Sequence, residues 1–133
     1  MKLIVAGGRH YNDYKQVRKA LDYFLSQTTE PVEIVSGACS TGTLTFTRPD
    51  GTMVCGADGL GERYAEERKL AVKYFPADWE HNGKAAGYMR NKDMAEYGTH
   101  CALFWDGISK GTESMRDLAV QYNLKLRIVK YQK

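Results

Sequence analysis

The feature that most constrains the fold is a short apolar run at residues 3–6 that ends at Gly7 and Gly8. Four consecutive apolar residues without helical spacing, stopped by two glycines, are typical of a buried strand that runs into a tight turn. Glycines at such a turn also let the backbone approach a ligand closely. Asn12 or Asp13 can then cap a helix, because a one-sided apolar pattern follows at Val17, Ala20, Leu21, Phe24 and Leu25. A strand, a glycine turn and a capped helix are how a nucleotide-binding α/β sheet begins. The same features are also expected of a strand–helix unit that binds no ligand.

The same alternation of apolar runs and helical patterns continues along the chain. Further strands are expected at residues 32–35, 71–75, 100–105 and 124–129, and further helices at 56–70, at 87–97 and from a cap at Thr112 onwards. Gly61 stands where the 56–70 helix can press closely against a sheet. Strands that alternate with helices form a parallel sheet that is covered on both faces. The sequence therefore predicts one Rossmann-like α/β domain over residues 1–133, with a doubly wound parallel sheet of about five strands.

Residues 39–55 interrupt this alternation and predict an inserted β-hairpin. Two Thr-rich stretches flank a strong turn signal at residues 48–51, Arg-Pro-Asp-Gly. Cys39 and Cys55 stand at the two ends of the insertion, and we expect both to be reduced thiols. The hairpin can form a lid on a crevice or an arm that reaches a neighbouring subunit. We favour the arm, and hence a homo-oligomer, because one face of the hairpin carries Leu44, Phe46 and Arg48.

Composition excludes several classes of function. The net charge of +3 is far below that of a typical DNA-binding surface, so we expect no nucleic-acid partner, whereas small anionic molecules fit. No segment approaches the length of a membrane span and no signal-peptide pattern opens the chain, so a cytoplasmic location without a membrane partner is expected. Three cysteines without Cys-x-x-Cys spacing and three scattered histidines predict neither a disulfide framework nor a metal site.

Glycine-containing turns follow several of the predicted strands, and such turns converge at the carboxyl edge of a parallel sheet. A phosphate group needs exposed backbone N–H groups, hydroxyls and one or two cations. No P-loop and no dinucleotide fingerprint is present, and we expect no separate cofactor. The expected ligand-binding residues are Gly7, Gly8, Arg9, Ser36, Gly37, Gly56, Asp58, Arg90, Asn91, Asp106, Ser109, Lys110, Gly111 and Thr112.

Four of the candidate side chains allow more than one role. Asp58 can accept a hydrogen bond from a ribose hydroxyl or cap its helix, and we favour the cap. Arg90 stands near the predicted start of a helix, where positive charge opposes the helix dipole, which favours a ligand-facing or ion-paired role. Trp105 can also stack on a base, but it ends an apolar strand, so we favour a place in the core. Trp79, in a predicted polar loop, can stack on a base or anchor a subunit contact.

Five groups of short motifs cover nearly the whole chain apart from the hairpin. They are residues 5–9, 36–37 with 56–58, 75–79, 84–91, and 104–107 with 111–112. Together they resemble the SLOG superfamily, specifically its YspA/YpsA-related group. The resemblance implies a Rossmann-like fold that binds a nucleotide or a nucleotide-derived, ADP-ribose-like ligand for sensing or sequestration, and it implies no defined reaction.

Two other branches of that superfamily imply alternatives. The LOG phosphoribohydrolases cleave the N-glycosidic bond of nucleoside monophosphates, and residues 90–94 are similar to their Arg-x-x-x-Met helix, which would make Arg90 catalytic. Residues 109–112 are similar to their Gly-Gly-x-Gly-Thr-x-x-Glu turn, but Met115 stands where the catalytic Glu would be. Cleavage through an oxocarbenium-like state needs a carboxylate near the ribose. The DprA branch binds single-stranded DNA, but the low net charge and the absence of an aromatic–basic stripe count against that function.

Overall fold

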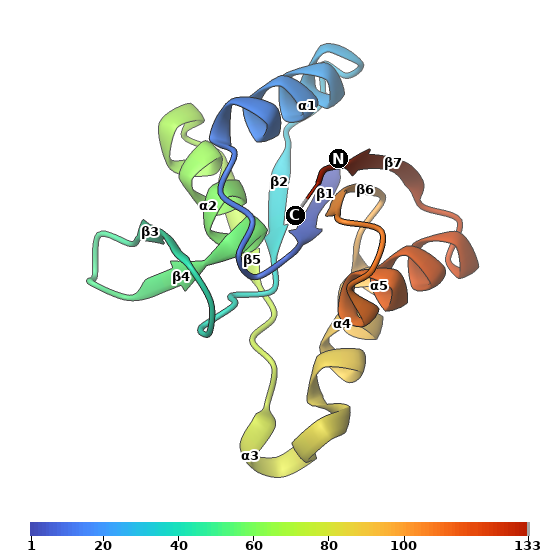
Figure 1. Cartoon of the computed structure of the whole chain (residues 1–133). Helices are drawn as coiled ribbons and strands as arrows, with labels where there is room; N and C mark the ends of the chain where they lie inside the picture. Colours follow the sequence, from blue (N-terminus) through green and yellow to red (C-terminus); the bar gives the residue numbers. More distant parts are fainter. Residues whose placement is uncertain (133) are drawn as a thin grey trace.

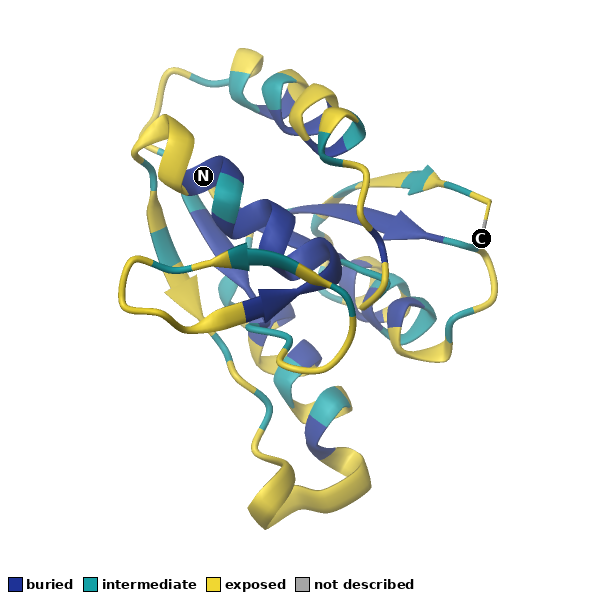
Figure 2. Ribbon diagram, turned by 60° about the vertical axis from the view of Figure 1, so that its left-hand side comes forward, coloured by how far each residue is buried: buried dark blue, intermediate teal, exposed yellow. Residues whose placement is uncertain are grey.

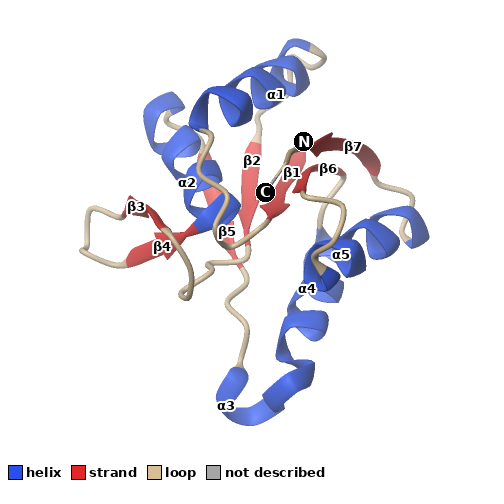
Figure 3. Cartoon of the chain, viewed as in Figure 1, coloured by secondary structure: helices blue, strands red, loops and turns tan. Residues whose placement is uncertain are grey.

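A computed structural model describes residues 1–132 of the chain (Figures 1 and 3). The strands are β1 (Lys2–Gly7), β2 (Glu33–Ser36), β3 (Leu44–Thr47), β4 (Met53–Cys55), β5 (Ala71–Tyr74), β6 (His100–Trp105) and β7 (Lys125–Lys130). The helices are α1 (Tyr14–Ser26), α2 (Gly56–Arg68), α3 (Trp79–Asn82), α4 (Ala86–Tyr97) and α5 (Lys110–Gln121), with a 3₁₀ turn, η1, at Gly83–Ala85. Of the two predicted caps for the first helix, Asp13 is the one present, because its carboxylate accepts from the Gln16 N–H at 3.1 Å.

Five strands form one parallel sheet in the order β5-β2-β1-β6-β7, which confirms the predicted fold class. The chain starts in the middle, builds outward to β5, and then crosses to the other side of β1 to continue with β6 and β7. The strand order therefore reverses between β1 and β6. Ligands of such sheets bind beyond the carboxyl ends of the strands at this reversal point.

Helices cover both faces of the sheet, so the central strands are buried on both sides (Figure 2). Leu3 and Val5 of β1 pack against α1 and α2, whereas Ile4 and Ala6 pack against α4 and α5. This alternation follows from the two-residue period of a strand. Within residues 1–132, no helix is both long enough and apolar enough to cross a bilayer.

The predicted insertion is a separate two-stranded antiparallel sheet, β3 with β4, and it packs against α2 (Figure 3). Every residue from Gly56 to Glu62 is buried, because the sheet covers one side of α2 and the hairpin covers the other. A Cβ atom on Gly61 would lie 2.7 Å from the Cβ of Val5, and one on Gly59 would lie 2.7 Å from the Val54 carbonyl oxygen. The predicted close approach of Gly61 to the sheet is confirmed.

Arg48, at the end of β3, fixes the hairpin to the body of its own chain. Its guanidinium donates to both carboxylate oxygens of Glu62, at 2.7 and 3.1 Å, and lies 4.2 Å from the centre of the Tyr74 ring. Glu62 is only 2% exposed and also accepts from the Ser36 hydroxyl at 2.6 Å. The expectation that Arg48 belongs to an arm directed at a neighbour is wrong, because Arg48 neutralises a buried carboxylate of this chain. A subunit contact through the rest of the hairpin stays a prediction.

Two boundaries differ from the sequence-based prediction. Residues 76–79 were expected to be a loop, but α3 begins at Trp79, because Asp78 caps a short turn by accepting from the His81 N–H, and η1 follows it. The last helix was expected to start with Thr112 as its cap. It starts at Lys110 with Ser109 at the cap position, so Thr112 lies inside the first turn.

Replacing Arg48 with methionine should destabilise the protein by about 3 kcal/mol or more, because the Glu62 carboxylate then stays buried without a positive charge to neutralise it. Arg63→Met is a matched control, since Arg63 also pairs with a glutamate, Glu67, and lies over a tyrosine ring, but Glu67 is 46% exposed. The control should cost less than about 1 kcal/mol. Urea unfolding followed by circular dichroism measures both. Equal losses in the two variants would contradict the role assigned to the buried carboxylate.

Candidate functional site

A cavity of about 640 Å³ lies at the carboxyl edge of the sheet, at the reversal point between β1 and β6. This volume is in the range of small-molecule sites. The walls come from the loop after β1, the start of α2, the first part of α4 and the start of α5. Ten of the expected residues line it: Gly7, Gly8, Arg9, Asp58, Arg90, Asn91, Ser109, Lys110, Gly111 and Thr112. We call it the rim cavity.

The other four expected residues lie outside the lining and support it from behind. The Ser36 hydroxyl, expected to hold phosphate, is buried and donates to Glu62 instead. The Gly37 carbonyl accepts from Arg90, and Gly56 begins α2 with its N–H donating to the Thr43 carbonyl. The Asp106 carboxylate accepts from the N–H groups of residues 108 and 109, which shapes the turn before α5. Residue type alone indicated that these four residues bind a ligand, but each of them makes hydrogen bonds within the chain instead.

Among the helices that begin at the rim cavity, α5 keeps its first amides available. At the start of α2, the Gly56 and Ala57 N–H groups already donate to backbone carbonyls of other segments. The N–H groups of residues 110–112 have no hydrogen-bond partner among residues 1–132. Unpaired amides and the positive end of the helix dipole make such a terminus a site for an anion.

Side chains reinforce this positive end of α5. Lys110 and Arg9 line the cavity, and the Thr112 hydroxyl donates to the Ser109 hydroxyl at 3.3 Å. Ser114, one turn further along α5, also lines the cavity. Its hydroxyl oxygen is buried and has no hydrogen-bond partner among the described residues. A buried hydroxyl without a hydrogen-bond partner lowers the stability of the folded chain. A bound ligand could supply the missing hydrogen bond.

Asp58 and Arg90 line another wall of the rim cavity, and each has its own hydrogen-bond partners. The Arg90 guanidinium donates to the Gly37 carbonyl and to the Asn91 side-chain oxygen at 2.9 Å, while the Asp58 carboxylate accepts from the Cys39 N–H at 3.0 Å. A Cβ atom on Gly37 would lie 2.6 Å from Arg90 Nη1 and 3.0 Å from Asp58 Oδ2. A side chain at position 37 would therefore displace one or both of these charged groups.

The structure corrects the helix positions assumed for both charged groups. Asp58 is not the cap of α2, since Cys55 occupies that position and Asp58 lies in the first turn. Arg90 is not at a helix start, because α4 begins four residues earlier, at Ala86. The argument from the opposing dipole therefore does not apply to Arg90, and its partners Gly37 and Asn91 explain its position instead.

Burial dominates the electrostatics of Asp58, which is 8% exposed. Loss of solvent raises the pKa of this carboxyl to about 6, although the Arg90 guanidinium and the Cys39 N–H each lower it. Nearby Glu62 raises it further. The carboxyl therefore changes its charge close to neutral pH, inside the cavity.

Several lining residues were not among the expected site residues. They include Cys39, Cys55, Trp79, Lys84, Tyr88, Met94, Ser114 and Met115. Trp79 and Tyr88 are large aromatics that are 56% and 53% exposed. The position of Trp79 in a polar segment had already allowed stacking on a base as one of its two roles. Met115 is 1% exposed at the cavity wall.

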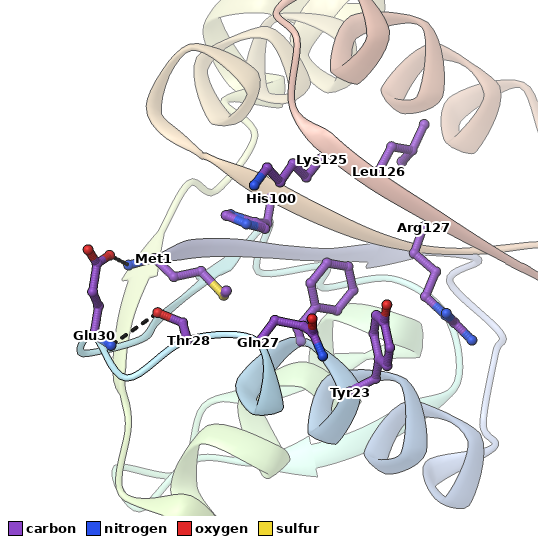
Figure 4. Close-up of a pocket in the computed structure, with 10 residues that line it drawn as sticks. Met1, Tyr23, Gln27, Thr28, Glu30, His100, Lys125, Leu126 and Arg127 are labelled. Atoms are coloured by element: carbon purple, nitrogen blue, oxygen red, sulfur yellow. Dashed lines mark hydrogen bonds and ion pairs between the residues drawn. The ribbon is translucent and has the colours of Figure 1, made fainter.

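A second cavity, of about 600 Å³, lies at the opposite edge of the sheet, between the end of α1 and the starts of β6 and β7 (Figure 4). Two of its charged groups have partners within the chain. The Met1 ammonium donates to the Pro31 carbonyl and lies 3.8 Å from the Glu30 carboxylate, and the Arg127 guanidinium lies 4.9 Å from the centre of the Tyr23 ring. This cavity faces the amino ends of the strands, away from the reversal point where ligands of such sheets bind.

Because the pKa of Asp58 is raised in the folded state, its contribution to the free energy of unfolding depends on pH. The folded state holds the Asp58 proton more tightly than the unfolded state, whose pKa is near 3.8. Its contribution is therefore fully present below pH 3.8 and is lost as the pH rises through 6, a change of about 3 kcal/mol. Asp58→Asn carries no such proton, so the free energy of unfolding of the variant minus that of the wild type should rise between pH 4 and pH 7. Urea titrations across this range measure the difference.

Asp50→Asn is the control for the sign of that effect. The Thr52 N–H and side chain lower the pKa of exposed Asp50, so its stabilising contribution grows as the pH rises. Because that contribution is complete above the unfolded pKa of 3.8, the corresponding difference for Asp50→Asn should fall as the pH rises toward 4 and stay nearly flat between pH 4 and pH 7. A flat profile for Asp58→Asn would mean that Asp58 ionises as an ordinary surface carboxyl.

Comparison of the chain with models of protein families, with curated proteins and with solved structures gave no match. The function of the chain therefore has to be inferred from its own residues and from the geometry of the rim cavity.

Proposed function

We propose that the rim cavity binds an anionic, ribose-containing molecule of the nucleotide class, for sensing or sequestration. The observation that carries the proposal is the convergence of Arg9, Arg90 and Lys110, from three different segments, on one cavity beside the unpaired amides of α5. An anion gains charge-assisted hydrogen bonds there without competing with other partners of those amides. The resemblance to the SLOG superfamily supports the same class of ligand.

The phosphate belongs at the start of α5 in this proposal. The N–H groups of residues 110–112 supply donors, Lys110 supplies a cation, and the hydroxyls of Ser109 and Thr112 supply further donors. The Lys110 side chain is 88% exposed, and its ammonium lies 4.0 Å from the Glu113 carboxylate. Such a long, exposed ion pair is weak, so Lys110 can leave it to bind a phosphate at little cost.

In this proposal the ribose lies between α5 and the side chains of Asp58 and Arg90. A carboxylate accepts hydrogen bonds from two ribose hydroxyls, and the buried Asp58 carboxyl lines this part of the cavity. Asn91 joins the two walls, because its side-chain amide donates to the Gly111 carbonyl at 3.3 Å. A ligand that bridges α4 and α5 would therefore meet walls that already hold each other in place.

Nucleoside monophosphates and ADP-ribose should raise the melting temperature of the protein, because they bind the folded state alone. At about 100 times its Kd, a ligand adds about 2.7 kcal/mol, or roughly 10 °C for a chain of this size. Lys110→Gln and Arg9→Gln should each weaken binding by about 10-fold or more, since each removes a charge-assisted hydrogen bond. Lys125→Gln, which removes a charge from the second cavity, should leave binding unchanged. Absence of a shift with every nucleotide tested would overturn the proposal.

The second candidate function is hydrolysis of the N-glycosidic bond of a nucleotide. The observation in its favour is Asp58, a carboxyl that lines the cavity beside Arg90 and changes its charge near pH 6. Met115 carries no carboxylate, so Asp58 would have to stabilise the oxocarbenium-like state or activate water.

Free base released from nucleoside monophosphates, followed by chromatography, tests this second function. If Asp58 acts in the reaction, Asp58→Asn should lower the rate by about 100-fold or more, while phosphate binding persists. Arg90→Ala should also abolish release. A wild-type protein that binds nucleotides and releases no base would exclude the hydrolase and leave the binding function.

A further inference from the structure

We propose that Trp79 is a stacking platform for the planar base of the ligand. This inference rests on the proposed function, and it assigns the part of the rim cavity beside α3 to the base. Trp79 opens α3, lines the cavity, and leaves 56% of its surface exposed. Its ring has no aromatic or cationic partner within the described residues, 1–132.

The contrast with the other tryptophan shows how unusual this exposure is. Trp105 is 5% exposed, as expected for a core residue, and its indole N–H donates to the Ser109 carbonyl at 3.1 Å. The Arg116 guanidinium and the Lys130 ammonium lie 4.9 and 5.4 Å from the centre of its ring. The contacts of Trp105 therefore stabilise the fold. In contrast, α3 contains no buried residue, so Trp79 contributes little to the stability of the fold.

The surroundings hold the Trp79 ring in place beside the cavity. A Cβ atom on Gly87 would lie 3.3 Å from the Cη2 atom of the ring, so the ring rests against the first turn of α4 at a residue without a side chain. Tyr88 and Lys84 line the same part of the cavity. A flat aromatic surface that is supported on one side and faces a cavity on the other is suited to stacking on a base.

The position of the ring also fits the order of groups in a nucleotide. Figure 1 shows α3 at the end of α4 that is farthest from the sheet, whereas α5 begins next to the carboxyl end of β6. Arg90 donates to the Gly37 carbonyl and Asp58 accepts from the Cys39 N–H, so both side chains lie beside the segment that follows the carboxyl end of β2. A ligand with its phosphate at the start of α5 and its ribose beside Asp58 would therefore direct its base outward, toward Trp79.

Ribose 5-phosphate is the probe that separates this inference from the proposed function, because it has the phosphate and the sugar but no base. Calorimetry on the full chain would compare it with the four ribonucleoside monophosphates. Trp79→Ala should weaken the bound monophosphates by about 10- to 100-fold and leave ribose 5-phosphate unchanged. Trp79→Phe should retain most of the affinity, since it keeps an aromatic face.

Tyr23→Ala is the matched control, because Tyr23 is 51% exposed and lines the second cavity. It should change neither affinity. Indole fluorescence gives a second measurement: the monophosphates should quench the wild type, and Trp79→Phe should abolish quenching, since the remaining Trp105 is buried. Unchanged melting temperatures of the free variants would show that each one folds.

Three results would overturn the inference. If Trp79→Ala weakens ribose 5-phosphate and the monophosphates equally, or weakens neither, Trp79 does not contact the base, while the proposed function stands. If Trp79→Ala changes the sedimentation coefficient and leaves the affinities unchanged, Trp79 belongs to a subunit contact. If the wild type binds none of the probes, the proposed function fails, and the inference fails with it.

Discussion

The structure depends on how closely α2 lies between the sheet and the hairpin. Gly61 touches Val5 on the sheet side, and Gly59 touches the Val54 carbonyl on the hairpin side, so neither position has room for a methyl group. A glycine inside a helix costs up to about 1 kcal/mol relative to alanine, and here close packing on both sides offsets that cost. The same position buries Asp58 and Glu62, because both lie on the part of α2 that is covered from two directions.

The position of α2 also joins the segments from which the rim cavity is built. The Ala57 N–H donates to the Gly8 carbonyl, and the Gly56 N–H donates to the Thr43 carbonyl at the base of the hairpin. The loop after β1, the hairpin and the start of α2 are therefore one hydrogen-bonded unit. Arg48 adds a charged link from the hairpin to Glu62. The insertion thus contributes to the wall of the site through backbone contacts, although it interrupts a connection that is usually short.

The sequence predicted those parts of the fold that depend on local periodicity. The apolar runs gave the parallel sheet, and the one-sided pattern gave α1, because each is buried on a predictable face. The α3 turn was missed because its residues are polar and make no pattern. The Arg48–Glu62 pair joins residues 14 apart through tertiary packing, which no local rule reveals. Ser36 and Asp106 had suitable chemistry for a ligand, but residue type does not show which way a side chain points.

Three departures from the usual rules of folding lie around the rim cavity. Asp58 is a buried carboxyl with a raised pKa, Ser114 has a buried hydroxyl without a partner within residues 1–132, and Trp79 exposes most of an indole. Each is unfavourable for stability taken alone. Groups of this kind gather at functional sites, where a ligand supplies the missing interactions. In the second cavity, by contrast, the Met1 ammonium and the Arg127 guanidinium already have partners within the chain. The two cavities are similar in volume, and the three unusual groups Asp58, Ser114 and Trp79 favour the rim cavity as the site.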